Sequence, residues 1–155
     1  MKNSIKILVL ILLSSVFSLA EPAKVVYDLT SGEITTIKNK LIRSLTAVAK
    51  HYEDKKEDVD IIVVISGDAY KFFIEDLKSS PYANDKKTED IQMTFHSGLE
   101  TLHTVYGVTF NMCETGMKAR KIEKKSLYKF VNAEMMKSVY LINAQNEGYA
   151  YLPIH

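Results

Sequence analysis

The run of residues 60–65, Asp-Ile-Ile-Val-Val-Ile, is the feature that most constrains how this chain can fold. All of its apolar residues are β-branched, and side chains of that shape favour strands. A continuous apolar run, without alternation, is typical of a strand that is buried on both faces. The run therefore predicts a central, parallel strand in an α/β fold.

Strand-prone and helix-prone segments alternate along the rest of the chain. The other predicted strands cover residues 24–29, 108–112, 129–133 and 149–153. Apolar spacing and composition predict helices over residues 34–52, 69–77, about 88–106, 114–121 and 136–146, with a loop over residues 79–90. This alternation predicts a three-layer α/β sandwich with a mostly parallel, five-stranded sheet.

The beginning of the chain has the pattern of a secretory signal peptide. Lys2 and Lys6 flank the start of an apolar run over residues 7–13, and Ser18 and Ala20 are small residues of the kind that a signal peptidase recognises. The apolar run is too short to span a membrane comfortably. We therefore predict a signal peptide over residues 1–20, a single domain over residues 21–155, export to the periplasm, and no membrane attachment after cleavage.

The charge balance argues against nucleic acid as a partner. Taking Lys2 and Lys6 from the 20 basic residues leaves 18, against 19 acidic residues. Binding to phosphates requires a basic excess or a basic face. The lysine-rich segment 118–125 is more typical of a solvated helix face. We expect no nucleic-acid partner.

Cys113 is the only cysteine, and it lies between a predicted strand and a predicted helix. It cannot form an internal disulfide, and zinc and c-type haem sites need further cysteines. The free N–H groups and the dipole at a helix start favour the thiolate, which is the form that attacks and carries sulfur. Glu114 opposes this effect because an adjacent negative charge disfavours thiolate. The alternative is a small, buried and inert side chain.

Other candidate site residues lie in loops at the carboxyl ends of strands, where parallel sheets place their sites. These are Thr30, Ser31, Gly32, Ser66, Gly67 and Asp68. Asp68 could orient a histidine or a ligand, although Ser-Gly-Asp is also ordinary turn and capping sequence. His96 and His103 lie on the flank of the predicted helix 88–106, and either could take the thiol proton of Cys113.

Two ligand hypotheses remain open from the residues alone. Met112, Cys113 and Met117, with the two histidines, are soft or borderline donors that could hold Cu(I), although methionines more often fill a core. Residues 30–32, with Thr35 and Thr36, could cradle a phosphate as flavin mononucleotide sites do. Aromatic platforms for a flavin are not apparent, and we predict neither a cofactor nor a bound metal.

Four segments, taken in order and spacing, resemble the DsrE/DsrF family of sulfur-handling proteins, in particular its small exported members. They are residues 25–28, 63–69, 102–117 and 141–151. The resemblance implies a parallel α/β fold and assembly into trimers or hexamers. It also implies a cysteine that carries sulfane sulfur as a persulfide, a role that falls on Cys113.

The leading hypothesis is therefore a periplasmic sulfur carrier that uses Cys113. The best-understood members of the family are cytoplasmic relay proteins, so the resemblance does not imply a sulfur donor or acceptor for an exported chain. The rival hypothesis is a non-catalytic binding or assembly module of the same fold, in which Cys113 is buried and inert.

Overall fold

The computed structural model describes residues 21–155, and the predicted signal peptide lies outside the described residues. In the described part, a five-stranded sheet runs in the order β4-β3-β2-β1-β5, and every neighbouring pair is parallel. The strands are β1 (Ala23–Leu29), β2 (Val59–Ile65), β3 (Thr109–Met112), β4 (Val131–Asn132) and β5 (Ala150–Ile154). The predicted α/β fold is confirmed.

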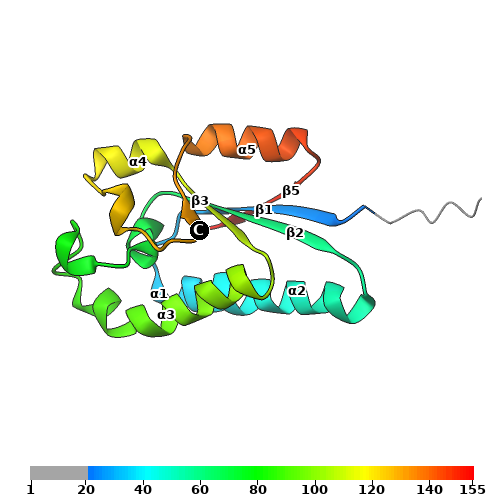
Figure 1. Ribbon diagram of the computed structural model, residues 1–155, viewed down its shortest axis with the longest axis horizontal. Coiled ribbons are helices and arrows are strands. Elements are labelled where there is room, and N and C mark those ends of the chain that lie inside the picture. Colours follow the sequence, from blue (N-terminus) through cyan, green and yellow to red (C-terminus); the bar gives the residue numbers. More distant parts are fainter. Residues whose placement is uncertain (1–20) are drawn as a thin grey trace, which may run out of the picture.

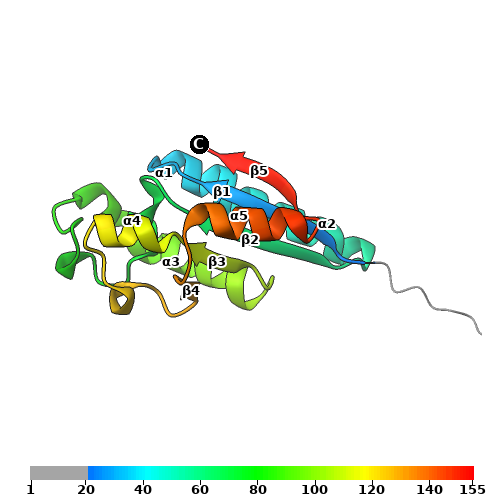
Figure 2. The same cartoon turned by 90° about the horizontal axis from the view of Figure 1, so that it is seen from above.

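Helices cover both faces of the sheet (Figure 1). One face carries α1 (Ile34–Thr36), the π-helical η1 (Ile37–Arg43), α2 (Ser44–Lys55) and α3 (Lys86–Thr104). The other face carries α4 (Glu114–Ala119) and α5 (Lys137–Asn146). Figure 2 shows α5 lying across the middle of the sheet, with β5 along one edge and β4 toward the other. None of the helices in the described residues is long and apolar enough to cross a membrane.

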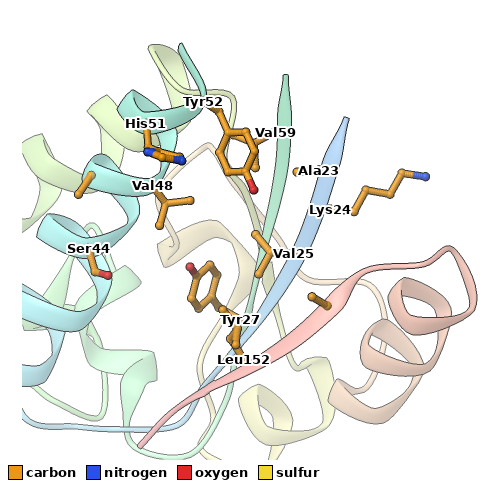
Figure 3. Close-up of a pocket in the computed structure, with 12 residues that line it drawn as sticks. Ala23, Lys24, Val25, Tyr27, Ser44, Val48, His51, Tyr52, Val59 and Leu152 are labelled. Carbon is orange, nitrogen blue, oxygen red and sulfur yellow. The ribbon is translucent and has the colours of Figure 1, made fainter. Parts of the chain in front are cut away.

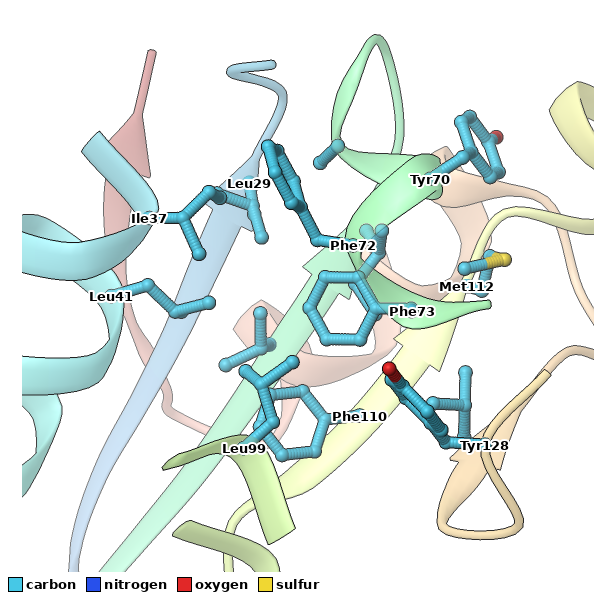
Figure 4. Packing of buried hydrophobic residues seen from close by; sticks show 14 of the residues in the cluster. Leu29, Ile37, Leu41, Tyr70, Phe72, Phe73, Leu99, Phe110, Met112 and Tyr128 are labelled. Carbon is cyan, nitrogen blue, oxygen red and sulfur yellow. The ribbon is translucent and has the colours of Figure 1, made fainter. Parts of the chain in front are cut away.

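The larger apolar cluster fills the space between the sheet and the α2–α3 layer (Figure 4). Leu29, Phe73, Leu99 and Phe110 are completely buried there. Because side chains alternate along a strand, β1 and β2 also contribute to a smaller cluster under α5. Its buried members are Val26, Val64, Tyr140, Ala144 and Tyr149. The double burial predicted for residues 60–65 is thus present.

The helix predicted over residues 69–77 is wrong beyond Phe73. The 3-10 segment η2 (Ala69–Phe73) ends there, and Ile74 is extended, with φ −100° and ψ 127°. Glu75 N–H donates to the carbonyl of Ser126, and Tyr128 N–H donates to the carbonyl of Phe73. These distant partners satisfy the backbone, so a continued helix is not required. Two further 3-10 segments are η3 (Leu77–Ser79) and η4 (Lys124–Ser126).

Other element boundaries differ by a few residues. Helix α3 begins at Lys86 rather than near residue 88, because the Asp85 side chain accepts the Thr88 N–H at 3.1 Å and caps the helix. Strand β4 is shorter than the predicted 129–133. The predicted helix stop at Gly148 is confirmed, and this glycine has φ +87°.

Candidate functional site

Cys113 lies at the carboxyl end of β3 and at the N-cap position of α4. Its N–H donates to the carbonyl of Ile65 at 2.9 Å, which extends the pairing of β3 with β2 by one residue. The sheet therefore fixes the backbone of Cys113, and the chain turns into α4 directly after it. The residue is 8% exposed.

The sulfur atom of Cys113 faces the starts of two helices. The backbone N–H of Lys137, the first residue of α5, donates to Cys113 Sγ at an N···S distance of 3.2 Å. Burial raises the pKa of the Cys113 thiol. Hydrogen bonding lowers the same pKa by more, so the thiol pKa lies below its ordinary value. The donors are the N–H groups of Gly116, Lys137 and Thr115 and the Tyr70 hydroxyl. The geometry thus favours the thiolate.

Glu114, which was expected to oppose the thiolate, forms an ion pair with Lys118 at 2.7 Å on the exposed side of α4. This pairing offsets the carboxylate charge beside Cys113. The hydrogen-bond donors around the Cys113 thiol therefore lower its pKa despite the neighbouring carboxylate.

Tyr70, from η2, holds the main chain of Cys113 from the other side. Its hydroxyl donates to the Cys113 carbonyl at 3.0 Å, and burial and the neighbouring Cys113 raise the pKa of the Tyr70 hydroxyl. The guanidinium of Arg120 lies 4.8 Å from the centre of the Tyr70 ring. Gly116 makes this arrangement possible, because a Cβ there would overlap the Tyr70 hydroxyl.

Cys113 is reached through an open, largely apolar depression of about 370 Å³. The depression is lined by Cys113, Thr115, Met136, Lys137, Ser138 and Leu141. Met136 is half exposed at its rim. The lining offers little polar surface that would compete for a ligand beside Cys113.

The loops after β1 and β2 meet at the same edge of the sheet. Asp68 N–H donates to the carbonyl of Thr30 at 3.0 Å. Gly67 has φ +62°, and a Cβ there would lie 2.6 Å from the Thr30 carbonyl oxygen, so this close approach requires glycine. Gly32 faces Asp68 in the same way, with a hypothetical Cβ 2.7 Å from the Asp68 Cβ.

The polar groups of these loop residues bind nearby backbone and side-chain groups and not Cys113. The Thr30 hydroxyl lies 2.8 Å from His155 Nδ1, and Ser31 Oγ accepts the Glu33 N–H at 3.3 Å. Ser66 is buried, and its N–H donates to the Leu29 carbonyl. The Asp68 carboxylate is largely exposed and lies 4.0 Å from Arg120. Asp68 thus reaches the thiol only indirectly, through Arg120 and Tyr70.

His96 and His103 do not support Cys113, and that part of the sequence hypothesis is wrong. The His96 ring stacks on Tyr128 at 4.2 Å, and the His103 ring stacks on Phe130 at 5.5 Å. Both lie on α3, on the opposite face of the sheet from α4 and α5 (Figure 1). His103 Nδ1 also lies 3.0 Å from the Val108 carbonyl.

Because the two histidines lie on α3, they do not join Cys113 in the Cu(I) site that the sequence suggested. Met112 and Met117 are buried in the core, and the imidazoles lie across the sheet from Cys113. In residues 21–155, no group of three or more His, Cys, Asp or Glu side chains could hold a metal ion.

Asp28 and Lys137 are site residues that the sequence analysis missed. Asp28 belongs to β1, is 3% exposed, and accepts the Lys137 ammonium at 2.8 Å and the Tyr151 hydroxyl at 2.9 Å on Oδ2. In the sequence, Asp28 stands inside an ordinary strand pattern and its partners are far along the chain. A buried charge in a strand is unusual, and that was the available signal.

A second cavity, of about 520 Å³, lies at the opposite ends of the strands. Figure 3 shows Tyr27, Val48, His51 and Tyr52 around it, between α2 and the sheet. Burial, with the neighbouring Tyr52, raises the pKa of Tyr27. The cavity is larger than the depression at Cys113, and Ser44 and His51 are among its lining residues. It lies at the amino ends of the strands, whereas parallel sheets carry their sites at the carboxyl ends.

Comparison with known proteins identifies relatives of this chain. An uncharacterized protein from Aquifex aeolicus (strain VF5) is 29% identical over 144 residues, which cover 93% of this chain. The chain spans 61% of the length of that relative.

Two solved structures have the same fold. One is the protein of unknown function MTH1491 from Methanobacterium thermoautotrophicum, with a TM-score of 0.59 and 17% identity. The other is the ychN protein from E. coli, with a TM-score of 0.57 and 19% identity. Each likeness covers 84% of this chain and 98% of the other. Residues 24–154, which include all five strands apart from the first residue of β1 and also include Cys113, match the DsrE/DsrF-like family, and the chain therefore belongs to that family.

Proposed function

We propose that this protein is a sulfur carrier in which Cys113 holds sulfane sulfur as a persulfide. The observation that carries the proposal is the hydrogen bond from the Lys137 N–H to Cys113 Sγ, in an open depression where the pKa of the thiol is lowered. Membership of a family with a sulfur-relay type of fold supports the same class of chemistry.

The proposed reaction needs no oxidant. The Cys113 thiolate attacks the outer sulfur of a donor persulfide, a new S–S bond forms at Sγ, and the donor's S–S bond breaks. The donor thiolate leaves with the electron pair of the broken bond, and Cys113 becomes the persulfide. In the second half, an acceptor thiolate attacks the outer sulfur and the Cys113 thiolate leaves.

The surroundings of Cys113 suit both halves. The N–H groups of Gly116 and Lys137 stabilise the thiolate before attack. They stabilise it again when Cys113 is the leaving group, and a thiol of lower pKa leaves faster. The apolar lining of the depression, to which Met136 and Leu141 contribute, favours a soft sulfur chain over a strongly hydrated anion.

Export and assembly extend the proposal. The basic start, apolar run and small residues of 1–20 support secretion to the periplasm, where the sulfur would be exchanged. Tyr151 and Leu152, 42% and 45% exposed on the edge strand β5, support a contact with further copies of the chain. N-terminal sequencing of periplasmic protein that begins at Glu21, and a molar mass in solution above that of one chain, are the expected results.

The direct test is the intact mass of the protein comprising residues 21–155 after incubation with inorganic polysulfide. Wild type should gain one or more sulfur atoms that a reductant removes, and Cys113→Ser should gain none. Addition only after unfolding would support the rival hypothesis of an inert, buried thiol. Unchanged loading of Cys113→Ser would overturn the proposal.

A further inference from the structure

Asp28 is a buried carboxylate with no direct part in the proposed sulfur chemistry. Its Oδ2 binds Lys137 and Tyr151, and its Oδ1 is buried with no hydrogen-bond partner among the described residues. Leaving an acceptor atom buried and unpaired costs free energy. A buried ion pair is often no more stabilising than apolar residues of similar volume. Stability alone is therefore a weak reason for a carboxylate at this position.

Lys137 joins Asp28 to the reactive sulfur. Its ammonium binds Asp28 at 2.8 Å, while its backbone N–H donates to Cys113 Sγ at 3.2 Å. Lys137 begins α5, and the N-cap residue Met136 gives no side-chain hydrogen bond in the described part of the chain. The attachment of the Lys137 side chain to β1 therefore fixes the first residue of α5 over the sheet.

A separate attachment holds the segment before α5. The Tyr140 hydroxyl accepts the N–H groups of Glu134 and Met135 at 2.9 and 3.2 Å, and Glu114 N–H donates to the Met135 carbonyl at 3.0 Å. These contacts orient the turn but stop short of Lys137. Tyr140 and Ala144 pack α5 on the sheet further along the helix, and the Lys137 side chain is the contact that holds its first residue.

We propose that Asp28 is a positioning residue, which keeps the Lys137 N–H aimed at Cys113 Sγ by holding the Lys137 ammonium. This inference rests on the proposed function, in which the Cys113 thiolate is the reacting group. Direct charge acts the other way, because a negative carboxylate near a thiol disfavours the thiolate. Positioning and direct charge therefore predict opposite effects when the carboxylate is removed.

The titratable and charged groups around Cys113 come from several elements. They are Asp28 from β1, Tyr70 from η2, Glu114 and Lys118 from α4, Arg120 directly after α4, and Lys137 from α5. The variants below change Asp28 or Lys137 and leave the other members in place.

The test is the rate of alkylation of Cys113 by iodoacetamide as a function of pH, in the folded protein. For Asp28→Ala we expect a higher thiol pKa and labelling about three- to tenfold slower below that pKa, the loss expected for one weakened hydrogen bond. Asp28→Asn, which keeps an oxygen acceptor for Lys137 and nearly the same volume, should slow labelling less. An unchanged profile, or faster labelling in both variants, would overturn the inference.

A double variant tests whether Asp28 acts through Lys137. In the Lys137→Met background, Asp28→Ala should cause no further slowing, because the carboxylate has lost the group that it holds. Independent slowing by both changes would contradict positioning. The matched control is Tyr149→Phe, which removes a partly buried hydrogen bond to Asp60 elsewhere on the α5 face. It should leave the labelling profile unchanged, and an equal slowing would show that general loosening is the cause.

The alkylation experiment and the sulfur-loading experiment test the two proposals separately. If wild type takes up sulfur but both Asp28 variants keep the wild-type labelling profile, the positioning role is wrong and the carrier proposal stands. If Asp28→Ala raises the thiol pKa but polysulfide adds no sulfur to wild type, positioning stands and the carrier proposal is wrong.

Discussion

The two faces of the sheet carry different kinds of side chains. On the α2–α3 face, aromatic and branched aliphatic side chains such as Phe73, Leu99 and Phe110 form a continuous core (Figure 4). On the α4–α5 face, a small apolar cluster shares the surface with an ion pair, Asp28–Lys137, and with the thiol of Cys113. One face provides most of the burial, and the other carries the groups that can react.

This difference separates the side chains that hold the fold together from the side chains around Cys113. The larger apolar cluster extends to Cys113 and Met117 at the carboxyl edge of the sheet, but most of its members lie between the sheet and the α2–α3 layer. We therefore expect the free energy of folding to rest mainly on that layer. The predictions below test that division, beginning with the largest expected effect.

Phe110→Ala should destabilise the protein by about 3–5 kcal/mol, because it leaves a cavity in the fully buried core. The measurement is the free energy of unfolding in denaturant. Met93→Ala, at an 87% exposed position, is the control and should change stability by less than about 0.5 kcal/mol. If Phe110→Ala cost no more than Tyr149→Phe on the α5 face, the contrast between the faces would fail.

Gly116→Ala should destabilise the protein by about 1–3 kcal/mol, because the added methyl group collides with the Tyr70 hydroxyl. At an unhindered helical position, the same change would stabilise by roughly 0.5–1 kcal/mol. Tyr70→Phe in the Gly116→Ala background should restore part of the loss. A stabilising effect of Gly116→Ala would mean that Tyr70 does not pack against α4 as described.

Lys137→Pro should slow alkylation of Cys113 by about tenfold below its thiol pKa, since proline has no N–H to donate to Sγ. Proline suits the first position of a helix, and Met136 has the extended backbone, φ −73° and ψ 153°, that a following proline requires. Lys137→Ala is the matched variant, because it removes the side chain but keeps the N–H. Its labelling rate should lie between those of wild type and Lys137→Pro, and a wild-type rate in Lys137→Pro would show that the backbone donor has no effect on the thiol.

The smallest effect is the pH dependence of stability. The folded thiol has a lowered pKa, so between the folded and unfolded pKa values the unfolded chain binds more protons and stability rises with pH. The contribution is complete above the unfolded thiol pKa of about 8.5 and is lost as the pH falls through the folded pKa. The difference in unfolding free energy between wild type and Cys113→Ser should therefore increase with pH. A difference that decreases with pH would contradict a lowered thiol pKa.

The sequence predicted the fold well because the β-branched run at 60–65 and the helical periodicities are local signals. It also placed Cys113 correctly at a strand–helix junction. It failed over residues 74–76, where an antiparallel bridge between Ile74 and Leu127 replaces the predicted helix. Such a pairing joins segments that are far apart in the sequence, and neither segment contains a local pattern that predicts the other.

The surroundings of the thiol were less predictable for the same reason. The two histidines are conspicuous in the sequence, yet they stack with Tyr128 and Phe130 in another layer. The group that donates to Sγ is a main-chain N–H, that of Lys137, and every residue except proline has such a group. Residue type gives no indication of which N–H will face a sulfur atom.

The pairing of β1 with β5 affects the order in which the sheet can be completed. The first strand of the described chain lies between β2 and the last strand, so one of its edges stays open until residues 150–154 arrive. Tyr151, which binds Asp28, comes with that last strand. During synthesis, the surroundings of Asp28 are therefore among the last parts to be completed, and the carboxylate that binds Lys137 gains its second partner only when β5 joins the sheet.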